Sequence, residues 1–300
     1  GHSLTEFVRI RYGVVAHIMV LLVMIFYMFI FLSAELTGIS QAVNLLGGTP
    51  LVFTASVVGI LTVIYTAFGG IKASIFTDSI QFTIIIPLIV AVFLILLVTL
   101  GGFGSAFESV NMQNPELFSF NNRPGIEFAF TLIIAIWAAD MFNGGFWQRV
   151  YSCKDGKSLK RGFLAAGLIV IPVIFIMGIL GIVAVGNGNL SEPSVALFEL
   201  ITTTLPGWAL GVVLVLALIL VMSSMDSLLS GISSVFTADL AGLKPALSGK
   251  KLLGFSRVAT ALLIVPVIIL ASNGYSVLYL FLIADLVCAA TVFPIFYGLF

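Results

Sequence analysis

Residues 220–234 read Leu-Val-Met-Ser-Ser-Met-Asp-Ser-Leu-Leu-Ser-Gly-Ile-Ser-Ser, a polar stretch inside a long apolar run. Small residues recur in it at three- or four-residue spacing and would share one helical face: Ser223, Ser227, Ser230, Gly231 and Ser234. Polar groups at membrane depth are costly and usually mark a pathway or binding site. Close helix packing through small residues is the alternative. Asp226, on the neighbouring face, favours binding.

The composition of the chain predicts a membrane protein. Of its 300 residues, 60% are hydrophobic and 9% charged, with a mean hydropathy of +1.22, whereas soluble domains carry about 25% charged residues. A net charge of zero argues against nucleic acid as a partner. The two cysteines, Cys153 and Cys288, lie far apart and indicate neither a disulfide framework nor a metal site. His2 and His17 have no ligand partner within a helical turn.

Apolar stretches long enough to cross a bilayer, about 20 residues each, recur along the whole chain. We expect one all-α transmembrane domain over residues 1–300 with about eight spans: 13–37, 51–69, 73–100, 127–148, 162–186, 206–236, 252–272 and 275–299. The polar segments 101–126 and 187–206 predict external loops or short surface helices. Because the chain opens on Gly1 and stops in an apolar run, we expect a piece of a longer protein.

The basic residues predict the orientation of the spans. With eight spans, twelve of the 13 Lys and Arg residues fall in loops on one side, and only Arg123 falls on the other. Positive loops face the cytoplasm, so we expect a multi-pass protein of the plasma membrane with its basic loops inside. This assignment puts every basic residue, Arg149 included, in a loop.

The pair Gly144-Gly145 predicts a discontinuity near the end of the fourth span. It follows Asp140 and Asn143, and transporters use broken helices at their binding sites. A simple kink within a continuous helix is the alternative.

Acidic residues within spans predict a cation site. They are Glu35, Asp78, Asp140, Asp226 and Asp285. A carboxylate facing lipid at a helix centre costs about 2.5–3.5 kcal/mol. No basic residue is expected inside the membrane to neutralise them, so carboxylates and hydroxyls together favour a monovalent cation. This argument leaves Na⁺ and H⁺ both open. Glu35 and Asp239, at the ends of spans, are expected to be solvated.

Four stretches resemble the sodium/solute symporter family. Residues 4–13 (Leu-Thr-Glu-Phe-Val-Arg-Ile-Arg-Tyr-Gly) are similar to the loop before its third core helix. Residues 69–81 (Gly-Gly-Ile-Lys-Ala-Ser-Ile-Phe-Thr-Asp-Ser-Ile-Gln) are similar to the entry of its fifth. Gln148-Arg149 and the basic loop after it are similar to the end of its sixth, and residues 221–239 to its eighth. The order and spacing of these motifs extend over nearly the whole chain.

The resemblance implies a five-plus-five inverted-repeat, LeuT-like transporter core. Residues 1–100 would hold core helices three to five of the first repeat, and residues 126–300 core helices six to ten, the complete second repeat. It also implies a sodium site with ligands from Leu220 (its carbonyl), Ser223 and Ser224, shared with a first core helix outside this chain. Asp78 would lie on the inward sodium path and, with Ser227, at a second site found in some members.

Substrate contacts implied by the resemblance come from core helices one, two, three, six and ten. The candidates are Trp137, Asp140 and Asn143, with Asp285 or Tyr279 from the tenth helix. The sugar-transporting members have a longer cluster of aromatic and amide residues before the Gln-Arg pair than residues 140–147 of this chain, which read Asp-Met-Phe-Asn-Gly-Gly-Phe-Trp. This difference favours a smaller polar solute of the urea, amino acid or carboxylate class.

The expected function is therefore sodium-coupled symport of a small polar organic solute, with Na⁺ as coupling ion. A proton-coupled carrier of the same fold and a transporter-like sensor module are the alternatives. We do not expect an enzyme, because neither His2 nor His17 lies near the polar core, where a hydroxyl nucleophile would need a base.

Overall fold

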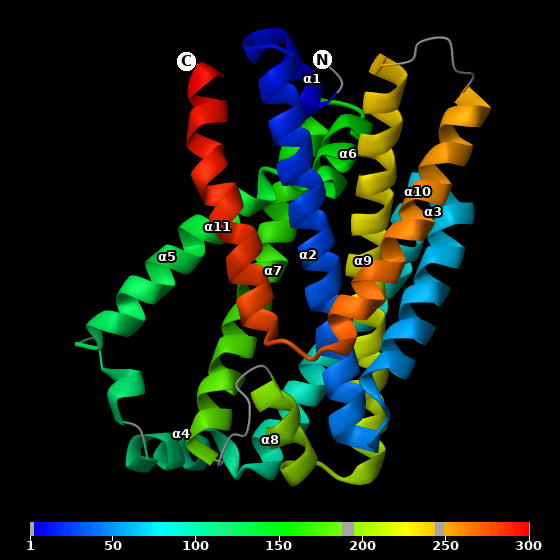
Figure 1. Ribbon diagram of the computed structural model, residues 1–300. Helices are drawn as coiled ribbons and strands as arrows, with labels where there is room; N and C mark the ends of the chain where they lie inside the picture. Colours follow the sequence, from blue (N-terminus) through cyan, green and yellow to red (C-terminus); the bar gives the residue numbers. More distant parts are fainter. Residues whose placement is uncertain (1–2, 114, 120, 188–194, 244–248, 300) are drawn as a thin grey trace.

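The computed structural model describes residues 3–113, 115–119, 121–187, 195–243 and 249–299, and this part of the chain contains helices and no strand. Figure 1 shows the helices packed as one bundle. Their bounds are α1 Leu4–Tyr12, α2 Val14–Gly47, α3 Leu51–Thr99, α4 Gly102–Gln113, η1 Pro115–Phe118, α5 Arg123–Asp140, α6 Gly144–Ser152, α7 Gly156–Asn187, α8 Ala196–Thr204, α9 Gly207–Leu243, α10 Gly249–Ser272, α11 Val277–Phe296 and η3 Tyr297–Leu299. The described parts of the polar segments 101–126 and 187–206 contain the short helices α4, η1 and α8, as expected. Residues 188–194 lie outside the described residues, and the external position of both segments stays a prediction.

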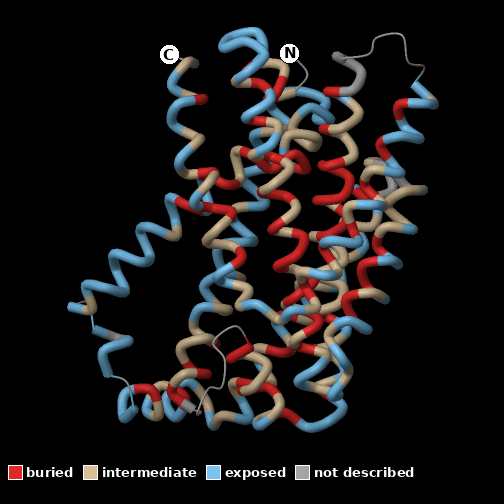
Figure 2. Tube along the Cα trace, viewed as in Figure 1, coloured by how far each residue is buried: buried red, intermediate tan, exposed pale blue. Residues whose placement is uncertain are grey.

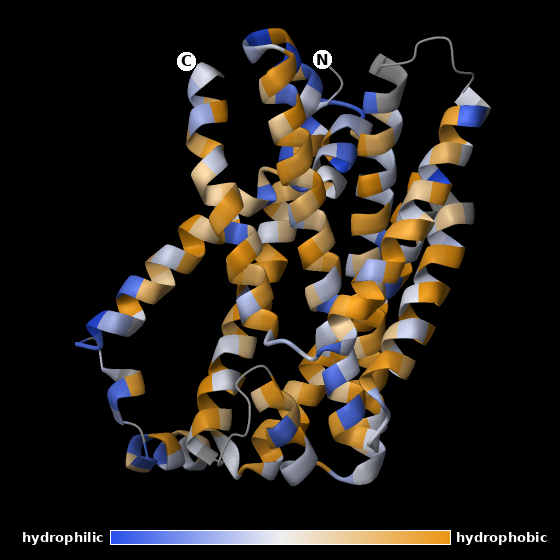
Figure 3. Cartoon of the chain, viewed as in Figure 1, coloured by the Kyte–Doolittle hydropathy of each residue, from blue (hydrophilic) through white to orange (hydrophobic). Residues whose placement is uncertain are grey.

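Helix α2 is the central element of the core. Its side chains Tyr27, Met28, Leu32 and Leu36 are almost fully buried and belong to one apolar cluster with residues of α9, α10 and α11. Figure 2 shows the buried residues gathered along α2 and α9, and Figure 3 shows apolar residues continuing onto the outside of the bundle. An apolar exterior around a packed interior is what a lipid-facing bundle requires.

The helices of the described chain are long and apolar enough for several membrane crossings. By length and hydropathy six could each cross a membrane, and the bent pair α5–α6 would be a seventh. The apolar helical stretch Leu51–Ala67, which covers the expected span 51–69, is shorter than this criterion requires. Helix α1 and the last turns of α11 lie at the same end of the bundle in Figure 1, as an even number of crossings requires.

The two expected spans 51–69 and 73–100 form one continuous helical segment, α3, so the loop expected around Lys72 is wrong. The segment nevertheless changes direction. Thr66 hydrogen-bonds Asp226 and Asp78 accepts from Ser223. Thr66 and Asp78 are twelve residues apart on α3, a distance of about 18 Å along a straight helix. Their partners on α9 are only three residues apart, a distance of about 4.5 Å. Two arms of α3 therefore pack against the same turn of α9.

Asp239 is not solvated as expected, and His17 has a partner. Nε2 of His17 lies 3.2 Å from Asp239 Oδ1, with both side chains less than 10% exposed. Nδ1 of His17 contacts the carbonyl of Thr5 at 2.9 Å. Because a carbonyl only accepts, Nδ1 is the ring nitrogen that donates to Thr5, and Nε2 faces the carboxyl group of Asp239. The pair joins α1, α2 and α9, which sequence spacing alone did not reveal.

We predict that His17→Leu destabilises the protein by about 3–5 kcal/mol, because it leaves the buried Asp239 carboxyl group without its partner. The double variant His17→Leu/Asp239→Leu should recover much of this loss, since it removes both polar groups. Thermal unfolding of the purified protein measures the effect.

The control for this prediction is Arg123→Gln, which breaks a pair whose side chains are 86% and 64% exposed. Such exposed pairs contribute about 0–1 kcal/mol. An equal loss in His17→Leu and Arg123→Gln would contradict the buried-pair account.

Candidate cation and solute site

The discontinuity expected at Gly144-Gly145 is confirmed. Helix α5 ends at Asp140, α6 begins at Gly144, and the two axes differ by 58°. Asn143 caps α6, because its side-chain oxygen accepts from the backbone N–H groups of Gly145 and Phe146. Asn143 therefore has a structural role as a helix cap, and its expected contact with a solute stays a prediction.

Helix α6 lies unusually close to α9 through three glycines. A Cβ atom on Gly231 would lie 2.5 Å from the backbone nitrogen of Gly145, and one on Gly145 would lie 2.9 Å from the carbonyl oxygen of Ser227. A Cβ atom on Gly144 would likewise meet the carbonyl oxygen of Gly231 at 3.3 Å. The backbone of α6 therefore packs directly on the backbone of α9. The small residues of α9 serve close helix packing, and its serines on the same face make polar contacts.

This close approach brings Arg149 into the bundle, so the prediction that every basic residue lies in a loop is wrong. Arg149 Nη2 lies 2.6 Å from Asp78 Oδ2 and 2.6 Å from Ser227 Oγ. Ser223 Oγ donates to the other carboxylate oxygen of Asp78 at 2.8 Å. Three of the five expected sodium residues, Asp78, Ser223 and Ser227, thus form one cluster with Arg149. We call these four residues the cation cluster.

The other two expected sodium residues, Leu220 and Ser224, lie near Glu35 of α2. Ser224 interacts with the carboxyl group of Glu35 on α2. Leu220 and Glu35 line a cavity of about 240 Å³ between α2, α9 and α11. Glu35 is therefore a cavity-lining group, in contrast to the solvated end expected from its position.

Asp226 is 2% exposed and belongs to the interior, as expected. Its Oδ1 accepts from Thr66 at 2.6 Å, whereas Oδ2 has no hydrogen-bond partner among the described residues. Tyr65, next to Thr66, donates to the carbonyl of Met222 at 2.8 Å. This carboxylate adds negative charge one turn from Ser223.

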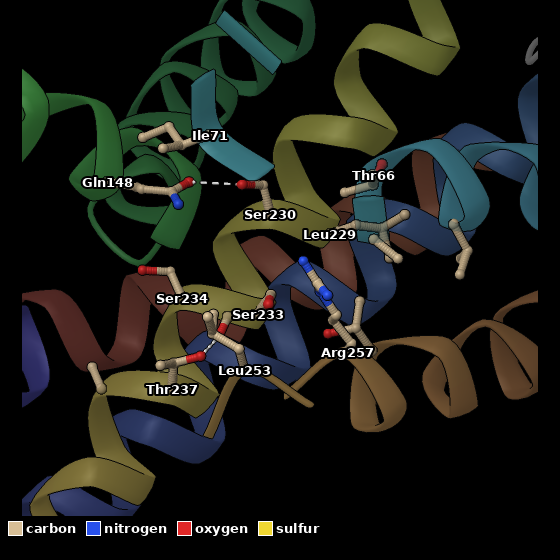
Figure 4. Close-up of a pocket in the computed structure, with 14 residues that line it drawn as sticks. Thr66, Ile71, Gln148, Leu229, Ser230, Ser233, Ser234, Thr237, Leu253 and Arg257 are labelled. Carbon is tan, nitrogen blue, oxygen red and sulfur yellow. Dashed lines mark hydrogen bonds between the residues drawn. The ribbon is translucent and has the colours of Figure 1, made fainter. Parts of the chain in front are cut away.

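A cavity of about 410 Å³ lies between α3, α6, α9 and α10, and its lining includes Ser230 and Gln148, the neighbour of Arg149 along the chain. Figure 4 shows hydroxyl groups of α9 facing it, with Ser230 bonded to Gln148 and Arg257 reaching in from α10. Ser230 lies one helical turn beyond Ser227. The cavity therefore places hydroxyl groups of α9 about one helical turn from Ser227.

A separate acidic cavity lies between α2, α5 and α11. It measures about 320 Å³ and is lined by Asp140 and Asp285 together with Tyr27, Phe31 and Phe281, among others. The side chain of Tyr27 lies beside Asp140 and Asn143. Of the expected solute residues, Asp140 and Asp285 are brought together here. Trp137 is 62% exposed on α5 and Tyr279 is 57% exposed on α11, and neither lines the cavity.

Sequence reasoning missed Arg149, Tyr27 and Phe281 as members of these sites. Arg149 follows a span and precedes a basic loop, so its sequence context predicts solvent. Its place one helical turn after Gly145 is informative only once the packing of α6 on α9 is known. Tyr27 and Phe281 are aromatic residues in apolar spans, where nothing distinguishes a lining residue from a packing one.

The profile of the Sodium:solute symporter family matches residues 2–300, and the chain belongs to this family. It is 31% identical over its whole length to the spermidine transporter DUR31 of Candida albicans, of which the match covers 56%. It is 30% identical over 70% of its length to a sodium/pantothenate symporter of Haemophilus influenzae, of which 45% is covered. The chain thus spans about half the length of these relatives.

A solved structure of a Na⁺-coupled sialic acid symporter shares the fold, with a TM-score of 0.73 at 22% identity. The match covers 99% of this chain and 66% of that one. The all-helical symporter fold expected from the sequence is thereby confirmed. The relatives are transporters, in agreement with the expectation that the chain is not an enzyme, and the apolar helices make it a multi-pass membrane protein.

We predict that Gly231→Ala strongly reduces the yield of folded protein, because its methyl group would overlap the backbone of Gly145. Separation of α6 from α9 would also pull Arg149 away from Ser227. Size-exclusion chromatography of the solubilised protein measures the yield.

Gly211→Ala is the matched control, since it lies on the same helix with no atom within 4 Å of an added Cβ. It should be neutral or stabilising by up to about 1 kcal/mol. Equal yields of the two variants would refute the close approach of α6 and α9.

Proposed function

We propose that this protein is a sodium-coupled symporter that carries a small polar organic solute across the plasma membrane, with its basic end in the cytoplasm. The observation that carries the proposal is the cation cluster of Asp78, Ser223, Ser227 and Arg149, a half-buried set of polar side chains that joins α3, α6 and α9 in a chain of the sodium:solute symporter family. The distribution of basic residues supports the orientation.

Ser223 is the best-prepared sodium ligand of the cluster. Its hydroxyl hydrogen points to Asp78 Oδ1, so the lone pairs of its oxygen are free for a cation. Asp78 would then act by orienting the hydroxyl of Ser223. The Leu220 carbonyl and Ser224 would complete the contribution of α9, with Glu35 adding negative charge beside Ser224.

Arg149 bears on how many sodium ions are carried. Its guanidinium group contacts both Asp78 and Ser227, the two residues of the expected second sodium site. A sodium ion could use both residues only after Arg149 had moved away. We therefore propose one sodium ion, at Ser223 and Ser224, for the state in which Arg149 pairs with Asp78.

The energetics of one coupled sodium ion are sufficient for accumulation of a solute. Movement of one positive charge through 100 mV provides about 2.3 kcal/mol, and a tenfold sodium gradient adds about 1.4 kcal/mol. Together they sustain a solute gradient of roughly 500-fold. Sodium binding would favour the outward-open arrangement, and inward opening would release the ion along the hydroxyl groups that line the cavity of Figure 4.

The names of the relatives leave the solute open among urea, amino acid, carboxylate and other classes. They include spermidine, pantothenate, urea and sugars, which differ in charge and size.

We predict that uptake by the intact protein in proteoliposomes requires a sodium gradient and that Ser223→Ala/Ser224→Ala abolishes it. Asp78→Asn should raise the half-saturating sodium concentration about 10- to 100-fold, the usual effect of losing a residue that orients a ligand. Ser105→Ala, on the exposed side of α4, is the control and should leave uptake unchanged.

Uptake that is indifferent to sodium but steep with pH would replace this proposal with a proton-coupled carrier. Binding of a solute without transport under any gradient would favour a sensor.

A further inference from the structure

We infer that the solute carries an ammonium group, which is bound between Asp140 and Asp285 against the aromatic side chains of the acidic cavity. The inference rests on the proposed function, because it names the chemical class of solute that the same transporter carries.

The first support is the charge of the cavity. Asp285 is 4% exposed, and Asp140 lines the same space from α5. Neither carboxyl group forms an ion pair with any basic residue of the described chain. Two neighbouring carboxylates repel each other and are costly to bury without a partner. A positive ligand would relieve both costs, whereas an anionic solute would add to them.

The position of Asp140 at a helix end strengthens the preference for a cation. It is the last residue of α5, where the unpaired carbonyl groups of the final turn concentrate negative partial charge. Discontinuous helices of transporters hold cations at such ends. The carboxylate of Asp140 and the end of α5 thus favour positive charge at the same place.

The size and walls of the cavity favour an organic cation over a metal ion. Its volume, about 320 Å³, is about ten times that of one water molecule in the liquid. A desolvated Na⁺ needs several oxygen ligands in close contact, yet the oxygens here come from Asp140, Asp285 and Tyr27, and the other six lining residues are apolar. Acidic groups beside hydrocarbon walls match an ammonium group on an aliphatic chain.

The aromatic side chains of the cavity also support binding of an ammonium group. Phe31 packs edge-on against Phe281 with their ring centres 4.9 Å apart, and against Tyr27 at 5.7 Å. All three line the cavity. Aromatic faces attract ammonium groups by about 0.5–2 kcal/mol, most strongly when the cation is desolvated. The cavity therefore combines carboxylate and aromatic contacts, as amine-binding sites do.

The test compares solutes of matched shape and different charge on the intact protein. Binding of labelled putrescine to the purified protein, and its uptake into proteoliposomes, are measured with n-butylamine and n-butanol as competitors. We expect both amines to bind and the alcohol not to compete. Asp285→Asn and Asp140→Asn should each raise the Kd for putrescine about 10- to 100-fold, as expected for lost hydrogen bonds to a charged group.

The controls separate binding from folding. Glu108→Gln, an acidic residue exposed on α4, should leave the Kd unchanged, and Asp285→Glu should keep part of the affinity. Sodium binding by Asp285→Asn should match that of the unaltered protein, because Asp285 lies outside the cation cluster.

Absence of amine binding, or amine binding that persists in both Asp→Asn variants, would overturn the inference. Sodium-driven uptake of a neutral solute without competition by amines would also overturn it while leaving the symport proposal intact. Amine uptake that depends on Asp285 but not on sodium would support the amine site and refute sodium coupling.

Discussion

The contact on which the cation cluster depends is the packing of α6 backbone against α9 backbone at Gly145 and Gly231. Any side chain at either position would force the helices apart. With them in contact, the residues that follow on α6, Gln148 and Arg149, reach the serines of α9. The ion pair between Arg149 and Asp78 then ties α3 to the same point.

The break between α5 and α6 connects the two proposed sites. Asp140, at the end of α5, faces the acidic cavity, and Arg149, on α6, belongs to the cation cluster. A rotation of α6 at the break would change the contact of Arg149 with Asp78 while α5 kept Asp140 in place. One broken helix therefore provides a physical route by which occupancy of one site can bias the other, as coupling between ion and solute requires.

Sequence patterns predicted what depends on periodicity and composition: the apolar helices, the polar face of α9 and the interior position of Asp226. The break after Asp140 was also predictable, because paired glycines beside polar residues are rare within a span. Contacts between distant segments were not. Such contacts depend on how the helices are placed in three dimensions, which the spacing of residues along one helix does not reveal. Examples are the partners of His17 and Arg149, the reversal within α3 and the proximity of Asp140 to Asp285.

The measurement that tests the central claim most directly is equilibrium binding of radioactive ²²Na⁺ to the purified intact protein, without any solute or gradient. The account predicts saturable binding that Asp78→Asn weakens and Ser223→Ala/Ser224→Ala abolishes, with Ser105→Ala unchanged. Saturable binding that is equally strong in all of these variants would contradict it, because the sodium ion would then be held by residues outside α9 and the cation cluster.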